Sequence, residues 1–289
     1  MEIPKISYHG GHSGQFCDHA EPNTTLEQVV EAYIAAEFKH FALTEHQPRT
    51  NEFLYPEEKE AGHDSLHLIT GFARYIKTAR ELQERFSDVA NILVGFETEW
   101  CGENAFEMTE WIRKREYPDF LVGSVHHVNG IPIDFDKANY ERAIEVCGSK
   151  DQLYADYFNA QMQLMREIKP EVIGHFDLIK IFAGEFQPSQ EVLDLARRNI
   201  NWAVKYGAIF EVNSRAFKKG LTEPYPGRVF LQMIKEEGGE VTLGDDSHGP
   251  GQVGLFYERS VPIVAEYFDH VIAFERPDYE LLKIPIPIK

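Results

Sequence analysis

Short apolar runs alternate along the chain with longer stretches in which apolar residues recur every three or four positions. The first pattern is typical of buried β-strands, and the second is typical of amphipathic helices. The predicted strands are Ile6–His9, Phe41–Thr44, Ile92–Glu97, Phe120–His126, Val172–His175, Ile209–Asn213 and Val241–Gly244, with a weaker eighth run at Val271–Phe274. The predicted helices are Thr25–Ala36, Leu66–Phe86, Lys150–Ile168, Gln190–Tyr206 and Val229–Glu237.

Repeated strand-then-helix units predict a parallel sheet with helices on the outside. Seven or eight such units favour a closed α/β barrel, which forms one domain over residues 1–289. An open, doubly wound sheet is the alternative. However, neither the G-x-G-x-x-G nor the G-x-x-x-x-G-K-[ST] motif that often follows an early strand of such a sheet is present.

Histidines and carboxylates follow the predicted strands at their C-terminal ends. They are His9 and His12 after the first strand, His46 after the second, Glu97 at the end of the third, His126 after the fourth, His175 and Asp177 after the fifth, and Asp246 and His248 after the seventh. In a barrel these strand ends form one rim, where active sites are assembled. We therefore expect the side chains to lie close together.

Nitrogen and oxygen donors of this kind suit divalent ions such as Zn, Mn or Fe. The candidate ligands are too numerous for a single tetrahedral ion, so the sequence predicts a multinuclear site. A carboxylate can bridge two ions. Both Glu97 and Glu99 leave the same face of the third strand, so their spacing leaves the choice of bridge open.

Two pairs of candidate ligands differ in how simply they converge. Asp246 and His248 are two residues apart and leave the same face of an extended strand. His9 and His12 are three residues apart and would not do so on a regular strand. The two glycines between them allow a bulge or a positive φ that would bring both histidines to one site.

Composition and charge exclude several classes of protein. The chain has 29 basic and 47 acidic residues, a net charge of −18, which argues against binding nucleic acid or an anionic membrane surface. No apolar run approaches the ~20 residues of a membrane span, and no signal peptide is apparent. Only three cysteines occur, too few for a disulfide framework, so a cytoplasmic location is predicted.

Two other hydrolytic chemistries lack their motifs. The segment His9-Gly10-Gly11 is similar to an esterase oxyanion motif, but the matching G-x-S-x-G nucleophile elbow is absent. The H-E-x-x-H helix of metalloproteases is absent as well.

Several segments, spread over nearly the whole chain, carry a resemblance to a known family. They are His12-Ser13-Gly14, Cys17-Asp18-His19-Ala20, Leu43 to Arg49 (LTEHQPR), Val122 to Asp136 (VGSVHHVNGIPIDFD), Ile168-Lys169-Pro170, Gly174 to Leu178 (GHFDL) and Asp245 to Gly249 (DDSHG). Together, and in this order, they resemble the polymerase-and-histidinol-phosphatase (PHP) superfamily. The closest resemblance is to its monofunctional histidinol-phosphatases of fungi and some bacteria.

The resemblance implies a distorted (β/α)7 barrel, similar to a TIM barrel, with three divalent metal ions at the C-terminal rim of the strands. It implies His9, His12, Glu97 and Asp246 as ligands of the first ion, Glu97, His126 and His175 of the second, and His19, His46 and His248 of the third. It thereby favours Glu97 over Glu99 as the bridge. The chain departs from the family's H-x-H motif, because it has H-G-G-H at this position.

The activity that the resemblance implies is hydrolysis of L-histidinol phosphate, a small molecule, to L-histidinol and phosphate in histidine biosynthesis. Two metal ions ~3.5–4 Å apart lower the pKa of a bridging water, and the resulting hydroxide would attack phosphorus. Asp246 and His248 are the predicted catalytic residues at the metals, and Asp177 or a rim histidine is the predicted proton donor. The candidate phosphate-binding cations near strand ends are Arg49, Lys180, Arg215 and Lys218.

Two alternatives stay open at this point. One is another PHP-superfamily phosphoesterase that acts on a nucleotide or a different phosphomonoester. The other is a metal-binding or regulatory barrel that retains the ligands without catalysis. No heptad repeat or exposed apolar stripe in the sequence selects an oligomeric state.

Overall fold

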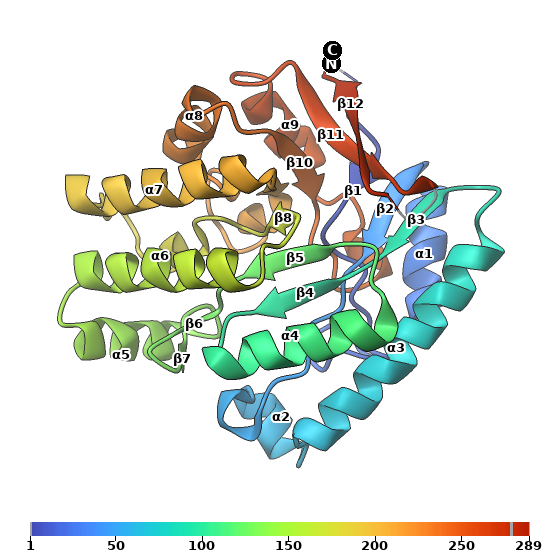
Figure 1. Ribbon diagram of the computed structural model, residues 1–289, viewed down its shortest axis with the longest axis horizontal. Helices are drawn as coiled ribbons and strands as arrows, with labels where there is room; N and C mark the ends of the chain where they lie inside the picture. The colour runs from blue at the N-terminus through green and yellow to red at the C-terminus, as the bar shows by residue number, and fades with distance from the viewer. Residues whose placement is uncertain (1, 278–279, 289) are drawn as a thin grey trace.

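Eight short strands lie at the centre of the molecule in two parallel sheets, and helices surround them (Figure 1). The computed structural model describes residues 2–277 and 280–288. The strand order is β1-β2-β3 in one sheet and β10-β9-β8-β5-β4 in the other. The bounds are β1 (Ile6–Ser7), β2 (His40–Leu43), β3 (Asn91–Val94), β4 (Phe96–Glu99), β5 (Leu121–Ser124), β8 (Val172–Ile173), β9 (Ile209–Asn213) and β10 (Val241–Gly244).

Two antiparallel pairs and the helices complete the fold. The pairs are β6 (His127–Val128) with β7 (Ile131–Pro132), and β11 (His270–Glu275) with β12 (Leu282–Pro287). The α-helices are α1 (Leu26–Ala35), α2 (Pro56–Glu60), α3 (Ser65–Arg85), α4 (Glu103–Glu116), α5 (Lys137–Cys147), α6 (Lys150–Glu167), α7 (Gln190–Tyr206), α8 (Arg228–Glu236) and α9 (Tyr257–Val264). Single 3₁₀ turns occur at Asn51–Phe53, Leu178–Lys180, Ser214–Phe217 and Pro250–Gln252.

The two parallel sheets meet where β3 continues into β4. Gly95 separates these strands, and a Cβ atom there would lie 2.5 Å from the Phe120 carbonyl oxygen, so only glycine allows the close approach. Beyond the end of β2, His46 pairs in parallel with Glu97 of β4. Two predicted ligands from different strands are therefore placed side by side by the backbone itself.

The sheets also meet at their other edges, where β1 and β10 lie together. The Tyr8 N–H donates to the Leu243 carbonyl oxygen at 2.9 Å, and the Asp246 N–H donates to the His9 carbonyl oxygen at 2.9 Å. The pairing of β1 with β10 thus brings the first and last segments that carry predicted ligands, near residues 9 and 246, next to each other.

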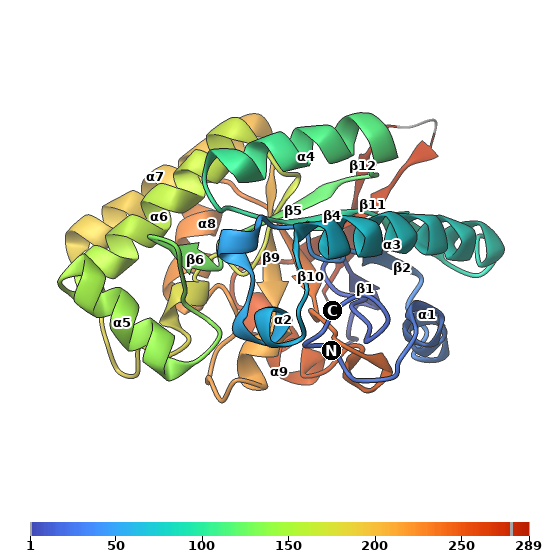
Figure 2. The ribbon, with the colours of Figure 1, turned by 90° about the horizontal axis from the view of Figure 1, so that it is seen from below.

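Capping residues define the ends of the outer helices, as α7 illustrates. The Ser189 side chain accepts a hydrogen bond from the Val192 N–H at the N-terminus, and Gly207, with φ of 89°, ends the helix. The buried positions Val192, Ala196, Ile200 and Ala203 recur on one face. Figure 2 shows α6 and α7 side by side on the outside of the strands. Within the described residues, no helix combines the length and apolar character needed to cross a membrane.

The predicted α/β class is confirmed, and every predicted strand and helix is present. Ile209–Asn213, Val241–Gly244 and Gln190–Tyr206 have the predicted bounds, the predicted strand Ile92–Glu97 is divided into β3 and β4, and the other elements have shifted ends. The weak eighth run forms β11, but it pairs antiparallel with β12 and does not join the parallel sheets. The sequence reading missed α2, α4, α5 and α9. Helix α4 is rich in charged residues and α9 contains Pro262, so neither shows the apolar period that reveals a helix.

Asp119 anchors the N-terminal end of β5, on the far side of the strands from their carboxyl ends. The carboxylate accepts hydrogen bonds from the Val94 N–H at 2.7 Å and from Arg80 Nη1 at 2.8 Å, and it also pairs with Arg276. Asp119 therefore ties α3, through Arg80, and the segment after β11, through Arg276, to the last residue of β3.

We expect Asp119→Ala to lower the free energy of unfolding by about 2 kcal/mol, because the buried Val94 N–H and two guanidinium groups lose their acceptor. Urea unfolding followed by circular dichroism measures this change. Glu81→Ala, which removes only an exposed pair with Lys77, serves as the control and should cost less than about 0.5 kcal/mol. Equal losses in the two variants would refute the anchoring role.

Candidate active site

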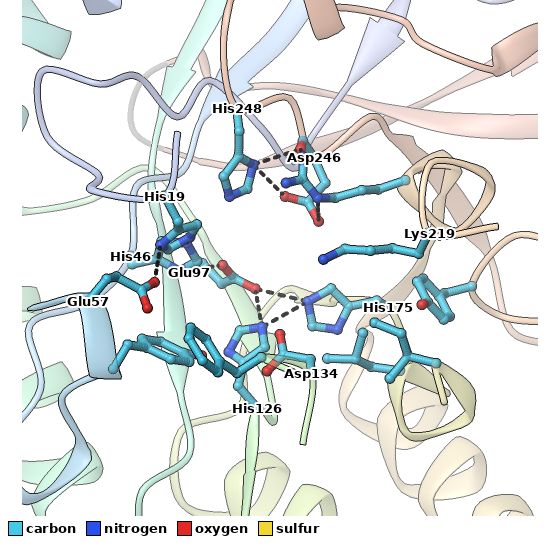
Figure 3. Close-up of a pocket in the computed structure, with 16 residues that line it drawn as sticks. His19, His46, Glu57, Glu97, His126, Asp134, His175, Lys219, Asp246 and His248 are labelled. Atoms are coloured by element: carbon cyan, nitrogen blue, oxygen red, sulfur yellow. Dashed lines mark hydrogen bonds and ion pairs between the residues drawn. The ribbon is translucent and has the colours of Figure 1, made fainter. Parts of the chain in front are cut away.

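A cavity of about 240 Å³ opens at the carboxyl ends of the parallel strands (Figure 3). Seven of the predicted metal ligands line it: His19, His46, Glu97, His126, His175, Asp246 and His248. The other two, His9 and His12, are fully buried and lie against Glu97 and Asp246, respectively. The structure therefore gathers all the predicted ligands at one end of the molecule.

Glu97, with only 1% of its surface exposed, lies at the centre of one half of this cluster. Its Oε1 atom is 3.3 Å from His9 Nε2, 3.4 Å from His126 Nε2 and 3.1 Å from His175 Nε2. Its Oε2 atom is 2.8 Å from His46 Nδ1. One carboxylate thus contacts imidazoles from four different segments.

The second half of the cluster is a group of stacked and tilted imidazoles beside Asp246. The ring centroids of His12 and His248 are 4.3 Å apart, those of His12 and His46 are 4.6 Å apart, and those of His19 and His248 are 5.0 Å apart. His12 Nε2 lies 3.8 Å from Asp246 Oδ1. Rings at this spacing present several nitrogen atoms to a common volume.

Unpaired nitrogen atoms indicate that a cation belongs in this cluster. His9 Nε2 and His12 Nε2 are buried and lie 3.3 and 3.8 Å from carboxylate oxygens, but neither has a hydrogen-bond partner among the described residues, which is unfavourable for a polar group. His126 Nε2 and His175 Nε2 face each other at 3.2 Å. Two imidazole nitrogens in this position either share a proton or bind a common ion. The donor set therefore fits divalent metal ions.

Buried carboxylates orient two of the rings. His9 Nδ1 lies 3.0 Å from Glu211 Oε2, and His12 Nδ1 lies 2.9 Å from Glu45 Oε1. A carboxylate on Nδ1 fixes the proton there and leaves Nε2 free to bind a metal ion, as is common for metal-binding histidines. Glu45 and Glu211 thus aim both rings into the cluster.

The structure distinguishes the two carboxylates that sequence spacing could not separate. Glu97 faces the Nε2 atoms of three histidines, the side on which metal ions would bind. Glu99 Oε1 instead pairs with Arg49 Nη1 at 2.8 Å and lies 3.5 Å from His126 Nδ1. The geometry favours Glu97 as a ligand and Glu99 as a residue that orients His126.

The charge of the cluster depends on its neighbours. Burial alone would raise the pKa of Glu97, but His9 and His126 outweigh burial and hold this pKa well below its usual range. The pKa of Asp246 is lowered as well, because His9 and Arg215 overcome the effect of burial. Both carboxylates are therefore ionised at neutral pH and able to bind cations.

The backbone departs from extended geometry where ligands converge. Gly10 and Gly11 have φ of 151° and 80°, and a Cβ at Gly10 would lie 2.5 Å from Asp245 Oδ1. The two glycines therefore act as the sequence suggested. The prediction that Asp246 and His248 share an extended strand is wrong, because β10 ends at Gly244 and Asp246 has a positive φ of 49°. A turn, and not a strand face, brings this pair together.

The predicted phosphate-binding cations are distributed differently from the expectation. Arg215 lines the cavity, whereas Arg49, Lys180 and Lys218 do not. The Arg49 guanidinium is already engaged by two buried glutamates, at 2.5 and 2.8 Å. Lys219, which the sequence reading did not select, lines the cavity next to Arg215.

Asp177, the predicted proton donor, lies outside the cavity and is paired. Its Oδ2 atom accepts from Lys180 Nζ at 2.8 Å and from the Gly227 N–H at 3.0 Å. Lys180 Nζ also donates to the Pro224 carbonyl oxygen at 2.7 Å. The two predicted site residues Asp177 and Lys180 thus hold the Pro224–Gly227 segment in place, and neither lines the cavity.

The site also contains residues that the sequence reading did not assign to it: Glu45, Asp134, Glu211, Lys219 and Tyr225. Glu211 could have been found, because it is a charged residue inside a buried apolar strand, which is rare without a partner. Asp134 lies in the Val122 to Asp136 run, and Glu45 adjoins His46. Lys219 and Tyr225 carry no such signal.

Comparison with known proteins finds relatives along most of the chain. The PHP domain family matches residues 10–215. A Schizosaccharomyces pombe protein named "Probable histidinol-phosphatase" is 45% identical over 259 residues, which cover 87% of this chain and 83% of the relative. The histidinol-phosphatase of Saccharomyces cerevisiae is 31% identical over 304 residues, which cover 92% of this chain and 89% of the relative.

A solved structure shares the fold. The crystal structure of histidinol phosphate phosphatase from Lactococcus lactis subsp. lactis, in complex with zinc, L-histidinol and phosphate, matches with a TM-score of 0.70 at 20% sequence identity. The match covers 98% of this chain and 100% of that chain. The fold is therefore shared over the full length of that protein.

We expect Glu97→Gln to lose at least one bound metal ion per chain, because the neutral amide cannot balance the charge of ions among these histidines. Glu99→Gln is the matched comparison. It removes only support for a ring and should weaken metal affinity by about 10- to 100-fold, leaving the site filled at saturating metal. Metal content measured by mass spectrometry after equilibration with excess metal distinguishes the two. A greater loss in Glu99→Gln would reverse the assignment.

Proposed function

The chain belongs to the PHP domain family, and from this premise we propose that it is a metal-dependent phosphatase that hydrolyses L-histidinol phosphate to L-histidinol and phosphate. The observation that carries the proposal is that two kinds of residue line one cavity. Clustered histidines surround Glu97, and the cationic side chains of Arg215 and Lys219 line the same cavity. Such a cavity can hold both metal ions and a phosphate group.

The family relationship and the donor set support divalent metal ions at this site. We propose three ions, of Zn, Mn or Fe. Their ligands would be His9, His12, Glu97 and Asp246 for the first ion, Glu97, His126 and His175 for the second, and His19, His46 and His248 for the third. His9 has close contacts with both Glu97 and the His12–Asp246 group, which supports its inclusion despite the H-G-G-H spacing.

Bound divalent ions would supply a hydroxide nucleophile at neutral pH and stabilise negative charge on the phosphoryl oxygens. The protein's own cations add to this. Arg215 Nη1 donates to the Asp246 carbonyl oxygen at 2.8 Å, which fixes the guanidinium beside the cluster, and Lys219 can approach the phosphate from the same side. Of the predicted catalytic residues, Asp246 and His248 line the cavity, which supports a role for them in the reaction, whereas Asp177 does not line it.

We also propose that the parallel strands form one distorted (β/α)7 barrel in a single domain over residues 1–289. Counting β3 and β4 as one strand broken at Gly95 gives seven strands. The backbone hydrogen bond between Tyr8 and Leu243 and the His46–Glu97 pairing, which join the two sheets at both edges, support this closed arrangement.

The names of the fungal relatives support L-histidinol phosphate as the substrate, as do the L-histidinol and phosphate bound in the L. lactis structure. We expect phosphate release from L-histidinol phosphate to exceed that from p-nitrophenyl phosphate or a nucleoside monophosphate by about 100-fold in kcat/KM. Chelation should abolish it, and added metal should restore it. Chelator-sensitive turnover of another ester alone would overturn the substrate. Bound metal with no turnover of any ester would overturn the activity.

Arg215→Ala should lower kcat/KM for L-histidinol phosphate by about 100-fold or more while the metal content is retained, because a charged contact to phosphate is lost. Lys218→Ala is the control, since Lys218 lies outside the cavity, and it should change kcat/KM by less than about 3-fold. Phosphate-release kinetics with parallel metal analysis provide the test. Similar kinetics in both variants would remove Arg215 from the site.

A further inference from the structure

Asp134 is a carboxylate in the cavity that the proposed chemistry does not use. Its Oδ1 atom is buried and has no hydrogen-bond partner in the part of the chain that the structure describes. Two other carboxylates that line the cavity, Glu97 and Asp246, have an oxygen within 4.0 Å of a histidine or arginine nitrogen. Glu57 Oε1 lies 4.0 Å from His19 Nδ1, but Glu57 Oε2 also lacks a hydrogen-bond partner among the described residues. A buried carboxylate oxygen without a partner is unfavourable, so a cationic group is what this position lacks.

Asp134 follows a short hairpin and lines the cavity. The strands β6 and β7 are joined by Asn129-Gly130, with φ of 50° and 75°, as a two-residue hairpin turn with positive φ at both positions requires. The Ile133 N–H donates to the His126 carbonyl oxygen at 2.9 Å and extends this pairing towards the site. This pairing of the residue before Asp134 holds Asp134, which is partly exposed, next to a predicted ligand.

The charges of the cavity are divided between its sides. Figure 3 shows Asp134 and Lys219 on opposite sides of His175. Arg215 also lines the cavity, so an anionic group has two cationic partners away from Asp134. Tyr55 and Tyr225 line the cavity as well, and aromatic faces tolerate an adjacent cation. The cavity thus suits a molecule with an anionic end and a cationic end.

We infer that Asp134 binds the ammonium group of the substrate and thereby selects phosphomonoesters of 2-amino alcohols over those of uncharged alcohols. The inference rests on the proposed function, since L-histidinol phosphate is such an ester. In a 2-amino alcohol phosphate only two carbon atoms separate the ammonium nitrogen from the ester oxygen. The ammonium and phosphate groups of such an ester are therefore close together. This spacing suits a small cavity in which Asp134 and Lys219 lie on opposite sides of His175.

The enzyme would discriminate against an uncharged ester because that ester leaves the Asp134 carboxylate without a partner. Such an ester would bury the Asp134 carboxylate against an apolar group, with neither water nor a donor to satisfy it. Sites built to pair with a polar substrate group reject analogues that lack it much more strongly than apolar pockets reject an extra methyl group. We therefore expect a preference of about 100-fold for the charged ester.

The experiment compares two esters of the same shape, L-alaninol phosphate and isobutyl phosphate, in which a methyl group replaces the ammonium group. The readout is the ratio of their kcat/KM values with the metal-loaded enzyme. The wild type should give a ratio of about 100, and Asp134→Asn should reduce it to within about 3-fold of unity. Because the readout is a ratio, a general loss of activity does not alter it.

Two further variants control for charge and for the cavity. Glu57→Gln removes another lining carboxylate that has an unpartnered oxygen, and should keep the wild-type ratio, whereas a collapse of the ratio in this variant would assign the ammonium group to Glu57 instead of Asp134. Asp134→Glu keeps the charge and should restore a ratio above that of Asp134→Asn. If Asp134→Asn fails to fold, Asp134→Ser gives the same comparison.

The outcomes separate this inference from the proposed function. A wild-type ratio near unity, or an unchanged ratio in the Asp134 variants, overturns the role of Asp134 even if L-histidinol phosphate is hydrolysed. A ratio that collapses only in the Asp134→Asn or Asp134→Ser variants supports the role. If the wild type shows the ratio but does not hydrolyse L-histidinol phosphate, the proposed substrate fails, while Asp134 still selects amino alcohol phosphates.

Discussion

The burial of Glu97 among imidazoles is the constraint on which the rest of the structure depends. A carboxylate that is almost fully buried is unfavourable unless positive charge or hydrogen-bond donors surround it. Here the compensating groups come from four segments: His9, His46, His126 and His175. The strands that carry these residues must therefore end at one level, and the fold meets this requirement by running them all parallel.

Residues behind the cluster complete it. Glu45 and Glu211 bind the Nδ1 atoms of two histidines, and Glu99, itself paired with Arg49, lies beside a third. These glutamates concentrate negative charge at one end of the molecule, where bound divalent ions would offset it. The strongly acidic composition is thus compatible with a phosphorylated substrate, because the field near the site is set by local groups and not by the net charge.

The cavity divides recognition among different parts of the fold. Strand ends supply the clustered histidines, the turn after β9 supplies Arg215 and Lys219, and the segment that follows β7 supplies Asp134. In the proposed function, each set of groups would contact one part of a phosphorylated amino alcohol.

The sequence by itself determined the α/β class, the order of the parallel strands and of five helices, and the gathering of histidines at strand ends, because apolar periodicity and chain position are local properties. Tertiary structure alone decided the roles of similar ionisable residues. Glu97 and Glu99 share a strand face, yet one meets Nε2 atoms and the other meets Arg49. Arg215 lines the cavity, whereas Arg49 does not. The reason is physical: the role of a buried charge depends on the partner it meets from another strand, and periodicity along one strand carries no information about that partner.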